Sequence, residues 1–255
     1  MPTPTRATKR AGSYLHASRA HRYSLLFALP LLLLYELLAA VLSHDPSVGG
    51  MRNGADVLLK ALFVAVAGYR GPLLFMAIVV GASLWLVWRD VRANGGKLEA
   101  WVFGGMVVES LALSVAFGIV VGTLTVHLLG PLGALAAGPQ PATMGLPARL
   151  MLSLGAGLYE ELLFRVTLVS ALASGARVLL GWTRTTSGVL ATIAGALIFS
   201  AFHYIGPYGD EWTLQSFTFR AIAGVMFSAL YLTRGFGITA WTHAMYDVLV
   251  LMVWA

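Results

Sequence analysis

Long apolar runs separated by short polar turns dominate this chain. The first run covers residues 23 to 43, which at about 1.5 Å per residue is long enough to cross the ~30 Å hydrocarbon core of a bilayer. Glycine and proline turns such as Arg70-Gly71-Pro72 separate the runs. The pattern predicts an all-α, polytopic transmembrane helix bundle with seven or eight helices. The further runs cover residues 55 to 69, 72 to 88, 101 to 129, 149 to 175, 188 to 205, 217 to 233 and 236 to 255.

The composition agrees with a membrane protein. Of the 255 residues, 58% are hydrophobic and 11% are charged, and the mean hydropathy is +0.79. The chain has no cysteine, which excludes disulfides, thiolate catalysis and Cys-ligated metals, so any nucleophile is an oxygen or a water. The net charge is +6, but the cations cluster in short loops between apolar runs, as the positive-inside rule expects. We therefore expect a lipid bilayer and no nucleic acid as a partner.

The positions of the cations predict which loops face the cytoplasm. A basic tail of residues 1 to 22 precedes the first apolar run, and no clear small-residue cleavage site follows that run, so we interpret it as an anchor helix. Loops containing Arg89, Arg177 and Arg234 are basic, and they alternate with loops free of cations, such as residues 130 to 147. We expect a multi-pass protein of a bacterial cytoplasmic membrane with its N-terminus in the cytoplasm.

The number of crossings depends on one ambiguous segment. Seven crossings, with the C-terminus outside, result if residues 55 to 69 lie at the interface or form the outer half of one broken helix with residues 72 to 88. An eighth full crossing would reverse the orientation of everything downstream. No repeat or linker divides the chain, so residues 23 to 255 are predicted to form a single transmembrane domain.

Two adjacent glutamates, Glu160 and Glu161, lie within an apolar run, and Arg165 follows one turn later. Ionisable groups at that depth are costly unless they pair or line a wet cavity, so they indicate a functional site. Helical i, i+4 spacing pairs Glu161 with Arg165, whereas Glu160 is rotated about 100° away and is free to act as a general base towards water. The alternative is a structural Glu-Arg bridge between helices, with Glu160 hydrogen-bonded to a neighbour.

Two histidine motifs follow on later apolar runs. Phe199 and His203 share one helical face, and His243 and Asp247 have the same i, i+4 spacing, so that the carboxylate can orient the imidazole. Taken singly, His203 can be an interfacial or capping group, and the second pair can merely connect helices. One shared polar cavity in the C-terminal half explains these residues together with the free glutamate.

Other polar and small residues in the apolar runs have weaker signals. Glu36, Glu109 and His127 have no partner at helical spacing, and we expect structural or gating roles for them. Small-residue spacings suggest close approaches of helices at two places. These are Gly118 with Gly122 and Gly155 with Gly157.

The three motifs, in this order, resemble those of the CPBP intramembrane proteases. They are the string EELLFR from Glu160 to Arg165, the pair Phe199 and His203, and the pair His243 and Asp247. This family, also called the Abi family, comprises the CAAX prenyl endoproteases with bacteriocin-processing and immunity relatives. The resemblance covers about residues 149 to 255, which we expect to be a protease-like core.

The resemblance implies catalytic roles for four residues. Glu160 with His203 would activate a water for attack on a peptide carbonyl, and His243 with Asp247 would stabilise the oxyanion. Family members often have Asn at position 247, and an ionised aspartate cannot donate to an oxyanion, so Asp247 stays protonated, orients His243 or ligates a metal. The residues that would support the site are Glu161, Arg165 and Phe199.

A metal is the alternative to activation of water by the side chains alone. Glu160, His203 and His243 would form a His₂Glu zinc set with water in the fourth position. The H-E-x-x-H pattern is absent, however, and the ligands would come from three helices. We therefore expect no required cofactor and keep Zn²⁺ as the less favoured possibility.

Three functions are compatible with these residues. The favoured one is an intramembrane endopeptidase that cuts a membrane-tethered peptide or protein, either prenylated, a leader or a C-terminal anchor segment. An ion- or proton-coupled transporter would use the same carboxylates and histidines as a relay. A noncatalytic immunity or scaffold protein is the third possibility, although a scaffold has no physical reason to bear the desolvation cost of this constellation.

Overall fold

The computed structural model is entirely helical over the residues that it describes, as the apolar pattern predicts, and no strand occurs among them. Most of the predicted basic tail and of the uncharged loop at residues 130 to 147 lies outside this part of the chain. The described residues are 14–45, 48, 50–95, 97–130, 145–206 and 209–253.

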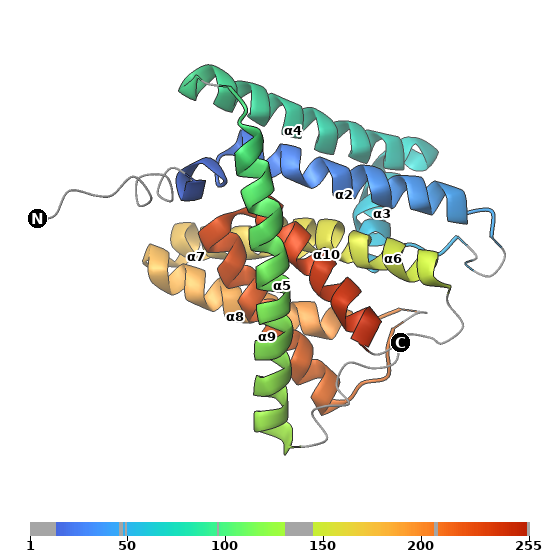
Figure 1. Cartoon of the computed structure of the whole chain (residues 1–255). Helices are drawn as coiled ribbons and strands as arrows, with labels where there is room; N and C mark the ends of the chain where they lie inside the picture. Colours follow the sequence, from blue (N-terminus) through green and yellow to red (C-terminus); the bar gives the residue numbers. More distant parts are fainter. Residues whose placement is uncertain are drawn as a thin grey trace, which may run out of the picture.

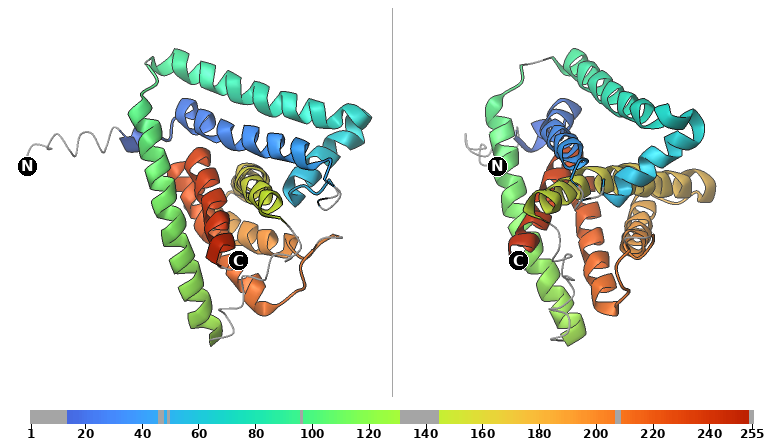
Figure 2. Two further views of the ribbon diagram at one scale, coloured as in Figure 1. Left: turned by 45° about the vertical axis from the view of Figure 1, so that its right-hand side comes forward. Right: turned by 90° about the vertical axis from the view of Figure 1, so that its right-hand side faces the viewer.

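The N-terminal half contains three long helices and one shorter one. The order is α2 (His21–Leu42), α3 (Gly54–Ala67), the 3₁₀ turn η1 (Gly68–Arg70), α4 (Gly71–Asn94) and α5 (Ala100–Leu129). The ambiguous segment of the sequence is thus two helices joined by a three-residue turn. The chain changes direction there (Figure 2). Gly68 has a φ of +56°, a backbone conformation that residues other than glycine rarely adopt.

The C-terminal half begins with one continuous helical segment that changes its hydrogen-bonding pattern twice. It consists of α6 (Leu146–Gly155), the π-helix η3 (Ala156–Val169) and α7 (Ser170–Leu180). Three helices complete the chain, and the last of them carries the second histidine motif. They are α8 (Arg184–Phe202), α9 (Leu214–Arg234) and α10 (Phe236–Val253).

The π-helix is the main local difference from the prediction. Side-chain hydroxyls in it and directly after it donate to carbonyl oxygens five residues earlier, from Thr167 to Leu162 at 2.9 Å and from Ser170 to Arg165 at 3.1 Å. The assumption of α-helical spacing around Glu160 was therefore wrong. A π-helix has wider turns and rotates less per residue, and it occurs mostly as single turns at functional sites.

Six helical segments among the described residues are long and apolar enough to cross a membrane, so the protein is a multi-pass membrane protein. The α3–α4 unit counts as one of the six, and so does the α6–η3–α7 segment. The seventh predicted crossing corresponds to α10, which is not among them. The seven-crossing topology and its orientation stay predictions.

Helix α10 lies at the centre of the packing. It contacts α2, α5, α6, α9 and η3. Helices α2 and α4 lie side by side, and α5 crosses them steeply (Figure 1). Helix α2 also packs on α6 and η3, so the N-terminal helices contact the part of the chain that carries the predicted motifs.

Glycine allows the closest of these approaches. A Cβ atom at Gly157 would lie 2.4 Å from the carbonyl oxygen of Ala240 and 2.7 Å from the Cβ of Ala244, so η3 and α10 touch backbone to backbone. The predicted close approach at Gly155 and Gly157 is confirmed. The one predicted at Gly118 and Gly122 is wrong, because a Cβ at either position has no neighbour within 4 Å among the described residues.

The close contact of Gly157 with α10 leads to a prediction about stability. Replacing Gly157 with alanine is expected to lower the free energy of unfolding by about 1–3 kcal/mol, because the added methyl group must push α10 away from η3. Thermal unfolding in detergent measures the effect. Gly175→Ala is the matched control, since Gly175 lies in α7 with open space around its Cα, and alanine there should leave stability unchanged or raise it. Equal melting temperatures for the two variants would contradict the prediction.

Candidate active site

Glu160 is buried on η3 between two polar side chains. The residue is 8% exposed, and its Oε1 accepts a hydrogen bond of 2.9 Å from the Nδ2 of Asn53. Its other oxygen, Oε2, lies 4.0 Å from the Nε2 of His203. The glutamate predicted to be free of Arg165 is thus held by an amide on one side and faces an imidazole on the other.

His203 lies at the C-terminal end of α8, one residue beyond the last helical position. Its Nδ1 lies 2.9 Å from the carbonyl oxygen of Phe199. A carbonyl oxygen only accepts, so Nδ1 carries a hydrogen, and Nε2 is the nitrogen that faces Glu160; in the neutral ring this Nε2 is an acceptor. The rings of Phe199 and His203 meet edge to face at 4.8 Å between centroids, so the predicted shared face is confirmed.

Glu161 has two partners, of which helical spacing revealed one. Its Oε1 lies 3.1 Å from the Nη1 of Arg165, so the predicted pair is confirmed. The same oxygen lies 2.6 Å from the Nδ1 of His243, 82 positions later in the chain. Glu161 is fully buried, and Arg165 is 1% exposed. Glu161 therefore joins the first and third motifs.

Two phenylalanine rings enclose the guanidinium of Arg165. Its carbon Cζ lies 4.5 Å from the ring centroid of Phe199 and 5.6 Å from that of Phe227. Phe227 also stacks on His243, with centroids 4.3 Å apart. These cation–π contacts favour the buried charge. Sequence reasoning missed Phe227, because a phenylalanine in an apolar helix carries no signal that distinguishes it from core.

Asp247 lies further from His243 than its spacing suggests. Its Oδ1 is 3.8 Å from the Nε2 of His243, beyond hydrogen-bond distance, so Glu161 and not Asp247 is the carboxylate that holds the ring. The side chains of Asp247 and His203 are 29% and 23% exposed. The predicted convergence of Glu160, His203, His243 and Asp247 is thus present as a cluster that is deeply buried at Glu161 and open towards Asp247 and His203.

Asn53 is a second site residue, after Phe227, that sequence reasoning missed. It is the N-cap of α3, where its Oδ1 accepts a hydrogen bond of 2.9 Å from the backbone N–H of Ala55. An asparagine just before an apolar run is a recognisable N-cap signal. The sequence does not reveal its contact with Glu160, because 107 positions separate the two residues.

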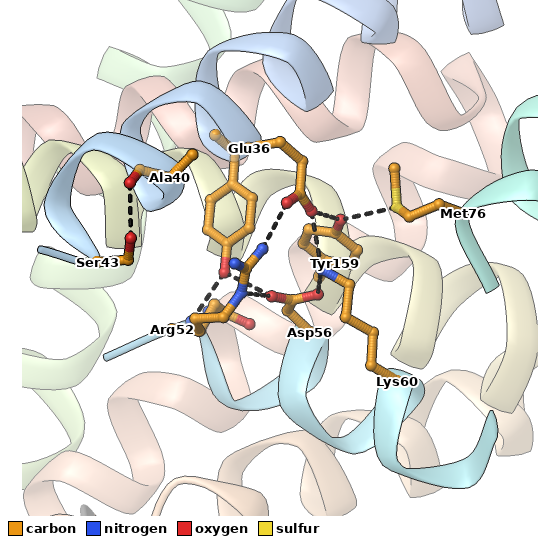
Figure 3. A network of polar contacts seen from close by, with 10 residues as sticks. Glu36, Ala40, Ser43, Arg52, Asp56, Lys60, Met76 and Tyr159 are labelled. Carbon is orange, nitrogen blue, oxygen red and sulfur yellow. Dashed lines mark hydrogen bonds and ion pairs between the residues drawn. The ribbon is translucent and has the colours of Figure 1, made fainter. Parts of the chain in front are cut away.

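A network of four charged side chains lies next to Tyr159 (Figure 3). Glu36, which has no partner at helical spacing in the sequence, accepts from Arg52 at 2.5 Å, from Lys60 at 2.8 Å and from the hydroxyl of Tyr159 at 2.5 Å. Asp56 accepts from Arg52 at 2.5 Å and from Lys60 at 2.6 Å. We call Glu36, Arg52, Asp56 and Lys60 the four-charge cluster.

The four-charge cluster is neutral when all its members are ionised, with two carboxylates and two cations. Burial opposes the charge of Arg52, and the hydrogen bonds to Asp56 and Glu36 outweigh it, so the pKa of Arg52 lies above its ordinary value. The cluster connects the end of α2 and the start of α3 with Tyr159, which directly precedes Glu160.

The other two weak candidates lie elsewhere. Glu109 accepts hydrogen bonds from Arg234 at 2.6 and 2.7 Å and from the hydroxyl of Tyr14 at 2.5 Å, and so connects α5 to α9 and to the residues before α2. His127 is exposed near the C-terminal end of α5. Glu109 therefore has the predicted structural role, and neither residue belongs to the candidate active site.

The arrangement was tested for a zinc site. No group of three histidine, aspartate or glutamate side chains in the described ranges could hold a metal ion. The Nδ1 atoms of His203 and His243 are engaged by Phe199 and Glu161, so Nε2 is the nitrogen that each ring presents, as in many histidine-ligated metal sites. As they lie here, the two histidines and Glu160 do not form a three-ligand zinc set.

Fold and site together define a class: a multi-pass helical membrane protein with a buried glutamate–histidine cluster between helices. Residues 142–249 match the family described as type II CAAX prenyl endopeptidase Rce1-like. This part of the chain is therefore an Rce1-like domain of the CAAX prenyl endopeptidase (CPBP) family, as the motif order predicts. All three motifs lie within it, and Asn53 lies outside it. No curated protein and no solved structure matches the chain.

Proposed function

We propose that the protein is an intramembrane endopeptidase that hydrolyses a peptide bond in a membrane-tethered substrate. Glu160 and His203 act on the attacking water, and His243 acts on the carbonyl oxygen. The observation that carries the proposal is the 4.0 Å separation between Glu160 Oε2 and His203 Nε2. In the proposed mechanism the imidazole is neutral, so both atoms are hydrogen-bond acceptors. A family of endopeptidases supports the same reaction class.

The distance between the two acceptors suits one bridging water. A polar separation beyond 3.5 Å has room for a water that donates to both sides. Such a water would give one O–H to the Glu160 carboxylate and the other to His203. Glu160 then takes the proton as general base while the water oxygen attacks the peptide carbonyl, and the proton passes to the leaving amine. His203 orients the water through Nε2.

His243 is placed to stabilise the oxyanion. Glu161 accepts from its Nδ1, so a protonated ring has one donor left, Nε2–H, which points towards the more exposed side of the cluster near Asp247. A preorganised donor aimed at developing negative charge is a large contribution to catalysis. Asp247, 3.8 Å from that nitrogen, donates to the oxyanion only when it is itself protonated.

Reconstitution tests the proposal directly. The purified protein in phospholipid vesicles is incubated with two peptides, one tethered through a prenylated C-terminal cysteine and one through a transmembrane anchor, and the products are identified by mass spectrometry. Cleavage at a defined bond of a tethered peptide, with an untethered peptide of the same sequence cut more slowly, is the expected result. Failure to cut either tethered peptide would contradict the proposal.

Metal removal separates the two ways of activating water. Because Glu160 and His203 activate the water without a metal, dialysis against a strong chelator is expected to leave the cleavage rate within about twofold of the untreated protein. As the control, the metal content of the protein is measured by elemental mass spectrometry before and after dialysis. A rate that falls with the metal and returns on addition of Zn²⁺ would overturn the metal-independent mechanism.

A further inference from the structure

We propose that Asn53 is a positioning residue for Glu160, so that a helix outside the Rce1-like domain completes the active site. The inference rests on the proposed function and extends it. Asn53 lies at the start of α3, and its Nδ2 donates to Glu160 Oε1 at 2.9 Å. Asn53 is 7% exposed and Glu160 8%. When one partner of a buried hydrogen bond is removed, water reaches the other partner poorly and leaves it unsatisfied.

The cap at α3 fixes which end of the Asn53 amide faces Glu160. Its Oδ1 is used by the backbone N–H of Ala55 at 2.9 Å, an orphan donor of the first helical turn. The other end of the amide is therefore NH₂, a donor, and it points at a carboxylate oxygen. Rotating the amide by 180° would lose the cap and set an acceptor against Glu160. The orientation is thus determined twice, once by the helix and once by the carboxylate.

The backbone of Asn53 is held as firmly as its side chain. Its N–H donates to the hydroxyl of Tyr35 at 3.1 Å, and this hydroxyl donates to Asp56 at 2.9 Å. Asp56 in turn is paired with Arg52 and Lys60. Through these contacts the four-charge cluster supports Asn53.

Space for Asn53 is kept by a glycine. A Cβ atom at Gly155 would lie 2.8 Å from the Cβ of Asn53 and 2.5 Å from the ring of Tyr35, so only glycine lets the end of α6 pass this close to the start of α3. The close pass brings the Asn53 amide within reach of Glu160, five positions further along the same helical segment.

The hydrogen bond fixes the rotation of the Glu160 carboxyl group. With Oε1 held by Asn53, Oε2 faces His203, which is the geometry needed for one water between them. Asn53 touches neither that water nor the substrate in this mechanism. Its effect is on the orientation of the base and on the ease with which the base takes a proton, because a donor to a carboxylate favours the ionised form.

Three substitutions separate the cap from the donor. Asn53→Ser keeps a good N-cap and loses the donor, Asn53→Asp keeps both the shape and the cap but places a second carboxyl group against Glu160, and Asn53→Ala loses cap and donor. Asn53→Ser is expected to lower kcat about tenfold to a hundredfold with KM little changed. The acidic limb of the pH–activity profile should move to higher pH in Asn53→Ser and further in Asn53→Asp, because a neighbouring carboxyl group disfavours ionisation of Glu160.

Two outcomes overturn the inference. One is a wild-type kcat and pH profile in both Asn53→Ser and Asn53→Asp. The other is a loss of rate that follows the fall in melting temperature across the three variants, with the acidic limb unmoved, since that result indicates only a capping role.

An infrared titration of Glu160 does not depend on peptide cleavage, so it tests the role of Asn53 independently of the proposed function. The infrared band of the protonated Glu160 carboxyl group, identified by its loss in Glu160→Gln, is titrated in the wild type and in Asn53→Asp. A shift of its midpoint to higher pH in Asn53→Asp supports the contact, and an unshifted midpoint contradicts it. Absence of cleavage by the wild type defeats the proposed function, whatever the band does.

Discussion

Glu160→Gln is expected to reduce peptide cleavage by on the order of a thousandfold while the protein keeps its fold. Glutamine has the same shape and still accepts from Asn53 through its carbonyl oxygen, so the buried contact survives. Its amide cannot take a proton from water, and it turns a donor, NH₂, towards the bridging water and His203 in place of the carboxylate oxygen that accepts there. The measurement is the initial rate on the tethered peptide in vesicles, together with the melting temperature in detergent.

A matched control for this variant is available on the same protein. Glu211 lies exposed in the segment between α8 and α9, and Glu211→Gln makes the same chemical change on an exposed side chain. It should cleave at the wild-type rate. Retention of more than about a tenth of the activity by Glu160→Gln would exclude Glu160 as the base, because removal of a general base costs a factor of about 10² or more.

Arg165→Met is expected to have the largest effect on stability, about 3–5 kcal/mol, because it removes the guanidinium that is paired with the buried Glu161 carboxylate. Glu161 is fully buried, and the Arg165 guanidinium lies 3.1 Å away between two phenylalanine rings. Methionine fills much of the same volume, so the loss is chiefly electrostatic. Thermal unfolding in detergent measures it.

The double variant Glu161→Gln with Arg165→Met tests that cause. Glutamine removes the uncompensated charge and still offers an oxygen to the Nδ1 of His243, so the double variant should be more stable than Arg165→Met alone. Arg177→Met, on the exposed surface of α7, is the control and should change stability little. A double variant less stable than Arg165→Met would show that the guanidinium acts through packing and not through the charge of Glu161.

The helices of this protein could be predicted from sequence because hydropathy and turn residues act locally. Each predicted apolar run corresponds to helix in the described residues, and the turn at Arg70-Gly71-Pro72 falls where α4 begins. The π-helical stretch around Glu160 could not be predicted, because its hydrogen-bonding pattern differs from an α-helix by one residue and leaves no signal in an apolar sequence.

The site was predictable where its contacts lie within one helix. Glu161 with Arg165 and Phe199 with His203 are four residues apart, and both pairs are present. Contacts between helices could not be predicted, since nothing in a single sequence shows that His243 forms a hydrogen bond with Glu161. The spacing of His243 and Asp247 even favoured the wrong partner, because neighbours on a helix face are not always within hydrogen-bond distance.

The pairing of Glu161 with His243 has a consequence for biosynthesis. Helices emerge from the ribosome in order, so η3 is made long before α10, 82 positions later at His243. Until that last helix arrives, Glu161 and Arg165 have only each other, and the cluster lacks one of its two imidazoles. In the proposed mechanism, a nascent chain therefore lacks the donor for the oxyanion until α10 has been made.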